Sequence, residues 1–242
     1  MVEPLSNGLL ASLSALDLDA LRPLRKTVEL PQGLVLFRTG DLMESVYFPF
    51  AGVISLVVDF EAGHTIEVAT LGTESLVGGS TVFASKISYN RAIVSVGGSA
   101  FVMDAHRLRA LAAESKSFRQ VLALHEELLL AQAQQTAACN ILHPIDARLS
   151  RWLLRCRDLT GSDELPLTQE FLGVLLGVKR SSLSLSASKL HERGFISYRR
   201  GHIHVANREG LEQSACECYA KLKANSARLL GKGSIRKNRR RR

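Results

Sequence analysis

The feature that most constrains the fold of this chain is a change in the period of its apolar residues near residue 117. Before that point, short β-branched or aromatic runs are separated by glycines, which is typical of strands joined by tight turns. Behind it, apolar residues recur every three or four positions, which is typical of helices. The sequence therefore predicts an α+β fold with a strand-rich front part and a helical back part.

The strand-rich part is expected to form a β-roll or jelly roll. Its runs are short and closely spaced, which favours an antiparallel barrel over a parallel sheet. A short helix over residues 9–21 is expected to precede them. The runs are "VELPQGLVLFRTGD", "SVYFPFAGVISLVVDF", "HTIEVATLG" and "NRAIVSVGGSAFVMD".

The helical part opens with one long helix. Ser117 and Gln120 fit a capping box at its start, and His143-Pro144 is expected to end it. The stripe behind the cap could pack on its own domain, as most helical stripes do. An unbroken seam over three heptads favours a homodimer instead. The seam consists of Val121, Leu124, Leu128, Ala131, Gln135, Ala138 and Leu142.

Length and composition narrow the class of protein. The 242 residues suffice for two ordinary domains, and 46% of them are hydrophobic. No apolar run reaches membrane-spanning length and no export signal is apparent, so we expect a soluble, cytoplasmic protein without membrane contact.

The four cysteines have no disulfide-framework spacing. Cys216 and Cys218 would supply half of a tetrahedral zinc site, but helix packing is the preferred interpretation, and Cys156 is also assigned to packing. The sequence thus predicts no metal site and no cofactor.

Charge is distributed unevenly along the chain. Residues 1–118 contain 9 basic and 12 acidic residues, whereas residues 166–242 contain 17 basic and 5 acidic residues. The excess includes a C-terminal run, "RKNRRRR", but residues 166–210 are basic without it. This asymmetry predicts a polyanionic partner for the back part only.

The stretch "LTQEFLGVLLGVKRSSLSLSASKL", residues 167–190, predicts two short helices separated by a turn. Thr168 can cap the first helix through its hydroxyl, and Gly177 can adopt the left-handed conformation that ends it. Gly173, Gly177 and Leu183 follow the small–glycine–apolar spacing of a helix-turn-helix unit. The second helix is expected to start near Arg180, with Leu183 and Leu190 facing inward.

The second helix of such a unit enters the major groove of DNA with its N-terminal residues at the base edges. Arg180 can donate two hydrogen bonds to guanine, and the serines beside it are short enough to allow close approach. The next segment, "RGFISYRRGHIHV", predicts a basic hairpin that touches the DNA backbone. The expected DNA contacts are Thr168, Gln169, Lys179, Arg180, Ser181, Ser182, Ser184, Lys189, Arg199 and Arg200.

These motifs resemble the Crp–Fnr superfamily of bacterial transcription regulators over residues 1 to about 219. The matching stretches are "LPQGLVLFRTGD", "VYFPFAGVISL", "HPIDARLSRWLL" and "LTQEFLGVLLGVKRSSLS" with "KLHERGFISYRRG". The resemblance implies a homodimer that binds a palindromic promoter site and contacts RNA polymerase. It also implies a cyclic-nucleotide-binding-like roll (residues 1–116), a dimerisation helix (117–143), a winged helix-turn-helix (144–210) and a C-terminal helix with a basic tail (211–242).

The chain departs from the nucleotide-binding members of that family. Gly79 stands where their glutamate holds the ribose, and Arg91 is followed directly by Ala92, one place out of register. Ser181 and Leu185 replace an acidic residue and an arginine of the recognition helix, and the N-terminal cysteine cluster of the iron–sulfur branch is absent. The effector is therefore expected not to be cyclic AMP and stays unidentified. Its predicted contacts are Gly78, Gly79, Ser80 and Arg91.

Two other classes were weighed against a DNA-binding regulator. One is a small-molecule or redox sensor that acts through protein contacts with weak DNA affinity. The other is an enzyme, which the sequence disfavours because no Ser-His-Asp set, carboxylate pair or Gly-rich phosphate loop stands out.

Overall fold

The computed structural model describes residues 7–83, 86–199 and 201–231. Arg200 and the basic C-terminal run lie outside these residues. The chain begins with two helices, α1 (Gly8–Ala11) and α2 (Ala15–Leu21), rather than the single predicted helix. The break arises because Ser14 starts a new helix, its hydroxyl accepting a hydrogen bond from the backbone N–H of Asp17 (3.1 Å). A 3-10 turn, η2 (Arg22–Leu24), leads into the sheet.

The front part is an antiparallel roll, as the sequence predicts. Its strands are β1 (Lys26–Leu30), β2 (Val35–Phe37), β3 (Ser45–Asp59), β4 (Thr65–Leu71) and β5 (Arg91–Asp104). They pair in the order β1-β5-β3-β4, and β2 also pairs with β5. The turn η3 (Gly79–Val82) lies between β4 and β5, and α3 (Ala105–Glu114) follows β5.

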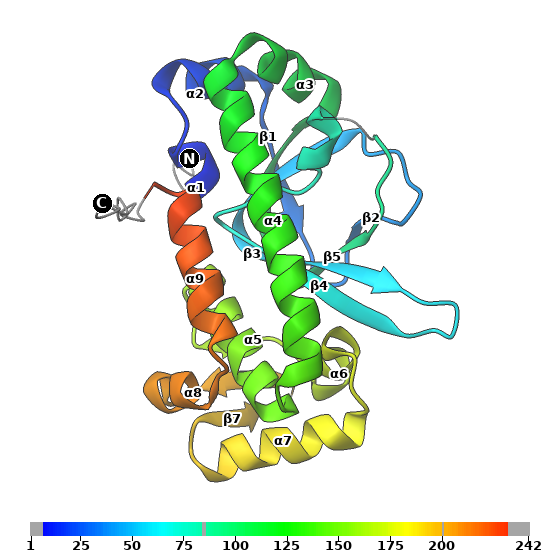
Figure 1. The fold of residues 1–242 in the computed structure, drawn as a ribbon, viewed down its shortest axis with the longest axis vertical. Helices are drawn as coiled ribbons and strands as arrows, with labels where there is room; N and C mark the ends of the chain where they lie inside the picture. Colours follow the sequence, from blue (N-terminus) through cyan, green and yellow to red (C-terminus); the bar gives the residue numbers. More distant parts are fainter. Residues whose placement is uncertain (1–6, 84–85, 200, 232–242) are drawn as a thin grey trace, which may run out of the picture.

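The long helix α4 (Lys116–Leu142) runs along the face of the roll (Figure 1). Its cap is Ser115, whose hydroxyl accepts from the N–H of Phe118 (3.1 Å), so the predicted capping box at Ser117 is wrong by two residues. The Ser117 hydroxyl instead donates to the Asp17 carboxylate (2.8 Å).

The inner face of α4 carries polar side chains that bind the roll. The Nε2 atom of His125 accepts from the N–H of Leu76 (3.3 Å), and its Nδ1 lies 3.0 Å from the carboxylate of Glu126. Gln132 donates to the carbonyl of Thr70 (3.2 Å). These bonds satisfy groups that would be costly to leave unpaired on a buried helix face.

The back part follows the predicted order. It contains α5 (Ile145–Thr160), β6 (Glu164–Leu165), α6 (Gln169–Leu176), α7 (Arg180–Glu192), β7 (Ile196–Arg199) and β8 (His202–Val205). The strands form a small sheet in the order β6-β8-β7. This arrangement confirms the α+β class with a C-terminal helix-turn-helix. In the described part of the chain, no helix has the length and apolar character needed to cross a membrane.

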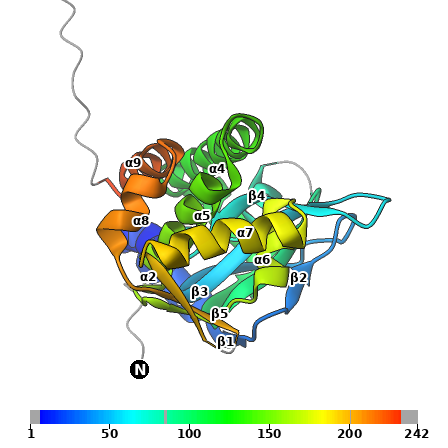
Figure 2. The same cartoon turned by 90° about the horizontal axis from the view of Figure 1, so that it is seen from below.

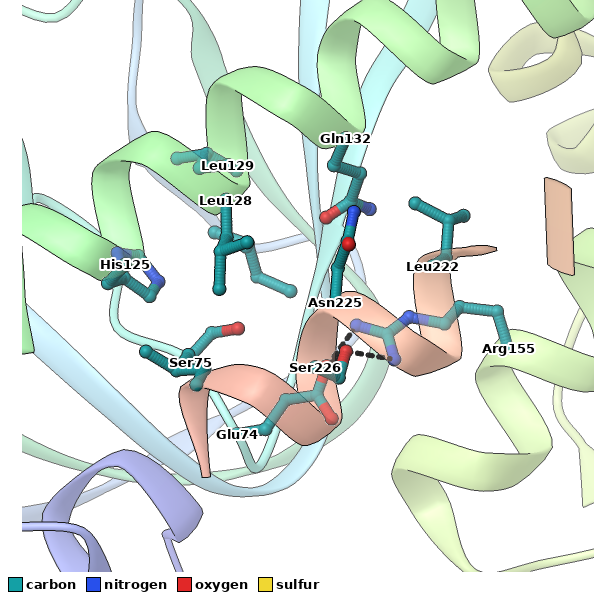
Figure 3. A pocket seen from close by; sticks show the side chains of 12 residues that line it. Glu74, Ser75, His125, Leu128, Leu129, Gln132, Arg155, Leu222, Asn225 and Ser226 are labelled. Atoms are coloured by element: carbon teal, nitrogen blue, oxygen red, sulfur yellow. Dashed lines mark hydrogen bonds and ion pairs between the residues drawn. The ribbon is translucent and has the colours of Figure 1, made fainter. Parts of the chain in front are cut away.

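Two further helices, α8 (Arg208–Ser214) and α9 (Cys218–Leu229), end the described chain. Helix α9 lies beside α4 (Figure 1). The Ser226 hydroxyl on α9 donates to the Glu74 carboxylate (2.5 Å), which also forms an ion pair with Arg155 of α5 (Figure 3). This network ties α9 to both halves of the chain.

The two halves share one buried contact region. Trp152 of α5 is fully buried, and its indole N–H donates to the carboxylate of Glu67 on β4 (2.9 Å). Glu67 also accepts from Ser55 and Thr70. Burial raises the pKa of Glu67, because the charged form loses its hydration. At a second point, the Gln32 side chain donates to the carbonyl of Pro166 (2.7 Å).

Candidate nucleic-acid interface and effector cavity

The helix-turn-helix is built as the sequence predicts. Thr168 caps α6, its hydroxyl accepting from the N–H of Phe171 (3.2 Å). Gly177 ends α6 with φ +64°, a backbone conformation that L residues other than glycine rarely adopt. A Cβ on Gly173 would lie 3.3 Å from the carbonyl oxygen of Val178, so a small residue there lets the turn close tightly. Leu183 and Leu190 are buried under α7.

Helix α7 lies across one end of the molecule (Figure 2). Lys179, Arg180 and Ser181 at its start are exposed, and Ser182 is half-buried. Lys179 forms no side-chain cap, so the first N–H groups of the helix point outward unblocked by a side chain. The start of α7 thus presents two cations and free backbone donors on one accessible surface.

The other predicted DNA contacts lie around that surface, and some of their side chains are held by hydrogen bonds whereas others are exposed. The Ser184 hydroxyl donates to the side-chain carbonyl of Gln169 (2.7 Å), which fixes both side chains between α6 and α7. Lys189 is exposed one helix turn beyond. Leu185, 60% exposed, lies on the outer face of α7 between them.

The hairpin of β7 and β8 forms the predicted wing. Arg199 is exposed at the end of β7, whereas Arg200 falls outside the described residues. The hydroxyl of Tyr198 is buried and has no hydrogen-bond partner among the residues described. Burial raises the pKa of Tyr198 to about 12, so this side chain stays neutral and contributes packing to the wing.

A cavity lies between the roll and α4, with a volume of about 600 Å³ including the part open to solvent. Three of the four predicted effector contacts, Gly78, Gly79 and Ser80, line it, and Glu126 of α4 lines it as well. No lysine or arginine of the described chain lines this cavity. A Cβ on Gly79 would lie 2.4 Å from the Glu126 carboxylate, so this carboxylate takes the space that a side chain at position 79 would need.

Arg91, the fourth predicted effector contact, is not brought to the cavity. Its guanidinium donates to both oxygens of Asp59 (2.7 and 2.6 Å) and to the Thr65 hydroxyl (3.3 Å). The hydrogen bond from Arg91 lowers the pKa of Asp59 to about 2. The bidentate pair holds Arg91 to the β3–β4 hairpin.

The predicted dimer seam of α4 is divided between two environments. Val121 and Leu128 pack against a buried cluster of their own chain that includes Leu229 of α9. The Gln135 amide donates to the Cys218 thiol (3.0 Å), also on α9. The remaining members, Leu124, Ala131, Ala138 and Leu142, are half-buried or exposed.

Two large apolar residues outside the predicted seam lie on the open side of α4. Leu130 is 60% exposed and Ile141 is 85% exposed, next to Leu142 at 74%. Sequence reasoning missed them because the 3-4 spacing was counted from Val121 only. A second row at the same spacing passes through Leu130 and Ile141, but Glu127 and Gln134 interrupt it, so it is not a continuous apolar seam.

The structure also brings together residues that the sequence analysis kept apart. Cys216 and Cys218 are buried, as their assignment to packing requires, but they meet Cys139 and His143 from the end of α4. The two cysteines near residue 217 are more than 70 positions from Cys139 and His143, so the sequence alone did not show this group. The i, i+4 spacing of Cys139 and His143 on one helix face was the available signal.

Comparison with models of protein families shows the family to which the chain belongs. Residues 27–115 match the model of the cyclic nucleotide-binding domain, and residues 147–214 match the model of the Crp-like helix-turn-helix domain. Together the two models cover more than half of the chain. The first falls on the roll and the second on the winged helix. The chain belongs to the Crp–Fnr superfamily. It is a Crp-like transcription regulator with a helix-turn-helix DNA-binding domain.

Solved structures of Crp–Fnr regulators share the fold at low identity. FixK2 from Bradyrhizobium japonicum is 16% identical with a TM-score of 0.67, covering 79% of this chain and 98% of its own. The c-di-GMP-responsive regulator CLP from Xanthomonas campestris is 15% identical with a TM-score of 0.65, covering 80% and 100%. A crp/fnr-family regulator from Eubacterium rectale is 15% identical with a TM-score of 0.65, covering 85% and 96%. No curated protein matches the sequence.

Proposed function

We propose that this Crp-like regulator acts as a cytoplasmic homodimer that reads a palindromic promoter site with α7 and contacts RNA polymerase there. It acts by binding rather than by catalysis. The observation that carries the proposal is the start of α7, where Lys179 and Arg180 stand exposed beside free helix N–H groups. A two-fold dimer would place two such helices in successive major grooves, about 34–36 Å apart.

Arg180 is the proposed base-reading residue, because it is the first residue of α7 and its guanidinium can bond two acceptors of one guanine. Arg199 on the wing is proposed to contact only phosphate, together with Arg200 and the C-terminal arginines. Thr168, Gln169, Ser181, Ser182, Ser184 and Lys189 complete the proposed interface.

Binding titrations at several salt concentrations test this division. Arg180→Ala is expected to weaken operator binding by about 1–3 kcal/mol and to relax preference at one base pair of each half-site. The matched control, Arg199→Ala, should weaken binding to operator and scrambled DNA alike and reduce the salt slope by about 0.9. Equal loss on both DNAs for Arg180→Ala would refute the assignment of α7.

The proposed dimer contact is the open side of α4, where Leu124, Leu130, Ile141 and Leu142 are exposed. Leu130 and Ile141 lie on one helix face, and Leu124 and Leu142 lie about a third of a turn around the helix from them. Exposed large apolar side chains along a helix are typical of an interface. Helix α9 lies against the side of α4 that carries Leu128 and Gln135. The proposed contact is therefore centred on Leu130 and Ile141.

Sedimentation of charged variants tests that contact. Leu130→Glu with Ile141→Glu should yield monomers at micromolar concentration without unfolding, since neither side chain is buried. Leu16→Glu on α2, where Leu16 is 84% exposed, is the matched control and should remain dimeric. A monomeric wild-type protein would overturn the proposal.

We further propose that cyclic AMP does not control this regulator. Its cavity presents the Glu126 carboxylate and no described cation, and Arg91 is bound to Asp59, so a cyclic phosphate would find no counter-charge. Isothermal calorimetry should detect no micromolar binding of cyclic AMP. Micromolar affinity accompanied by tighter operator binding would contradict this.

A further inference from the structure

Four potential metal ligands meet where α4 ends. Cys139, His143, Cys216 and Cys218 each offer one ligand atom, and these four atoms all lie within 4.8 Å of one another. The sulfurs of Cys139 and Cys216 are 3.5 Å apart, and the sulfur of Cys218 is 3.7 Å from Nδ1 of His143. The three cysteines are buried and His143 is partly buried, so the group is closed to bulk water on most sides.

The two shortest of these separations, 3.5 and 3.7 Å, match the edges of a metal tetrahedron, and the 4.8 Å limit on the rest allows the group to close around an ion. With metal–sulfur bonds of about 2.3 Å and metal–nitrogen bonds of about 2.0–2.1 Å, ligand atoms around Zn²⁺ lie about 3.4–3.8 Å apart. A disulfide needs sulfurs about 2.05 Å apart, well short of the distance between Cys139 and Cys216. A disulfide between them would also leave Cys218 and His143 without a role.

Neighbouring side chains orient the potential ligands and form hydrogen bonds that suit a metal-bound state. Nε2 of His143 lies 3.1 Å from the Glu217 carboxylate, which leaves Nδ1 facing the thiols. A carboxylate behind a histidine ring is the usual outer partner of a metal-bound imidazole. Gln135 donates to the Cys218 sulfur (3.0 Å), a contact that favours a sulfur carrying negative charge.

Two buried cations lie close to the group. Arg148 and Arg151 on α5 are almost fully buried, and their charges act on Cys139. Neither forms a salt bridge with a carboxylate of the described residues. Three thiolates and one neutral imidazole around a divalent ion carry a net charge of about −1, which these arginines would offset.

We propose that Cys139, His143, Cys216 and Cys218 bind one Zn²⁺ ion in a structural, tetrahedral site. Binding releases the three thiol protons to solvent, and the imidazole binds in its neutral form. The ion joins the last turn of α4, the His143-Pro144 link into α5 and the loop between α8 and α9. It therefore fastens α9 to α4 at the junction between the roll and the DNA-binding half, whether or not the proposed DNA contacts are correct.

Metal analysis of the full-length protein, purified without oxygen and without chelators, tests the site. About one zinc per chain is expected, and cobalt substitution should give the visible bands of a tetrahedral ion with thiolate charge-transfer absorption. Cys216→Ser and Cys218→Ser should each lose most of the zinc. At saturating cobalt, the thiolate absorption per bound ion should fall by about one third in each variant, because one of three sulfurs is removed.

The fourth cysteine of the chain provides the matched control. Cys156 is buried on α5 outside the group, so Cys156→Ala should keep its zinc. If the serine variants fail to fold, the cobalt spectrum of the unmodified protein decides the ligand count. Zinc below about 0.1 per chain, a Cys139–Cys216 disulfide in reductant-treated protein, or full zinc in the serine variants would overturn the proposal.

Discussion

Replacing Trp152 with phenylalanine tests the contact that joins the two halves of the chain. The variant keeps an aromatic ring in the core but removes the N–H that donates to Glu67 (2.9 Å). Ser55 and Thr70 still donate to the same carboxylate. The change therefore isolates one hydrogen bond to a buried carboxyl group, which burial keeps neutral until the pH exceeds its raised pKa.

The cost follows from two contributions. A hydrogen bond to a charged group contributes about 1.5–3 kcal/mol, against about 0.5–1.5 kcal/mol for a neutral one. The smaller ring leaves a cavity of about 40 Å³, which costs about 1 kcal/mol at about 24 cal/mol per Å³. Trp152→Phe should thus reduce the free energy of unfolding by about 2.5–4 kcal/mol. With Glu67→Gln already present, the acceptor is neutral and the cost should fall to about 1.5–2.5 kcal/mol.

Urea unfolding of the wild type, both single variants and the double variant, at a pH above the raised pKa of Glu67 so that its carboxylate is charged, gives the coupling energy directly. Circular dichroism is the suitable probe, because Trp152 is the only tryptophan. All four proteins should be compared at one chain concentration, since dimerisation would shift their midpoints. A cost of Trp152→Phe that is equal in the two backgrounds, within about 0.3 kcal/mol, would refute a charge-assisted bond at this interface.

Three further outcomes follow from the same structure. Burial raises the pKa of Glu67 above its usual 4.5, so its contribution to stability is present below pH 4.5 and is lost as the pH rises through the folded-state pKa. In urea titrations, Glu67→Gln should therefore gain stability relative to the wild type as the pH rises above 4.5. Gly177→Ala should be more destabilising than Gly161→Ala in thermal melts. Both glycines have positive φ, at a cost of about 1–2 kcal/mol for alanine, but only a Cβ on Gly177 would meet Ile66, at 3.0 Å. Ser115→Ala, which removes the cap of α4, should cost about 1 kcal/mol in urea unfolding.

The elements that local chemistry determines could be predicted from the sequence. Thr168 and Gly177 mark the ends of α6 because capping and left-handed backbone depend on one or two neighbouring residues. The strand-rich character of the roll and the hairpin of the winged helix followed from period and turn residues. The α4 cap was misplaced because Ser115 and Ser117 both fit, and only the Asp17 carboxylate decides which serine is free to cap.

What the sequence could not provide depends on contacts between distant segments. Helix α9 lies beside α4, where Leu128 packs against its own chain and Gln135 donates to Cys218, and no local pattern states where a C-terminal helix docks. Arg91 was expected at the effector site, but the partner that holds it, Asp59, belongs to another strand. The meeting of Cys139 with Cys216 likewise needs the complete fold.

The polar bonds on the inner face of α4 limit how this helix can move. Rolling α4 by one residue would turn its side chains by about 100°, pulling His125 from the Leu76 N–H and Gln132 from the Thr70 carbonyl. Two buried backbone groups would then lose their partners together, a cost of about 1–3 kcal/mol each. Rotation of α4 about its axis is thus costly. Bending at His143-Pro144, where α4 ends, would leave both hydrogen bonds in place, and the proposed zinc ion would stiffen that joint.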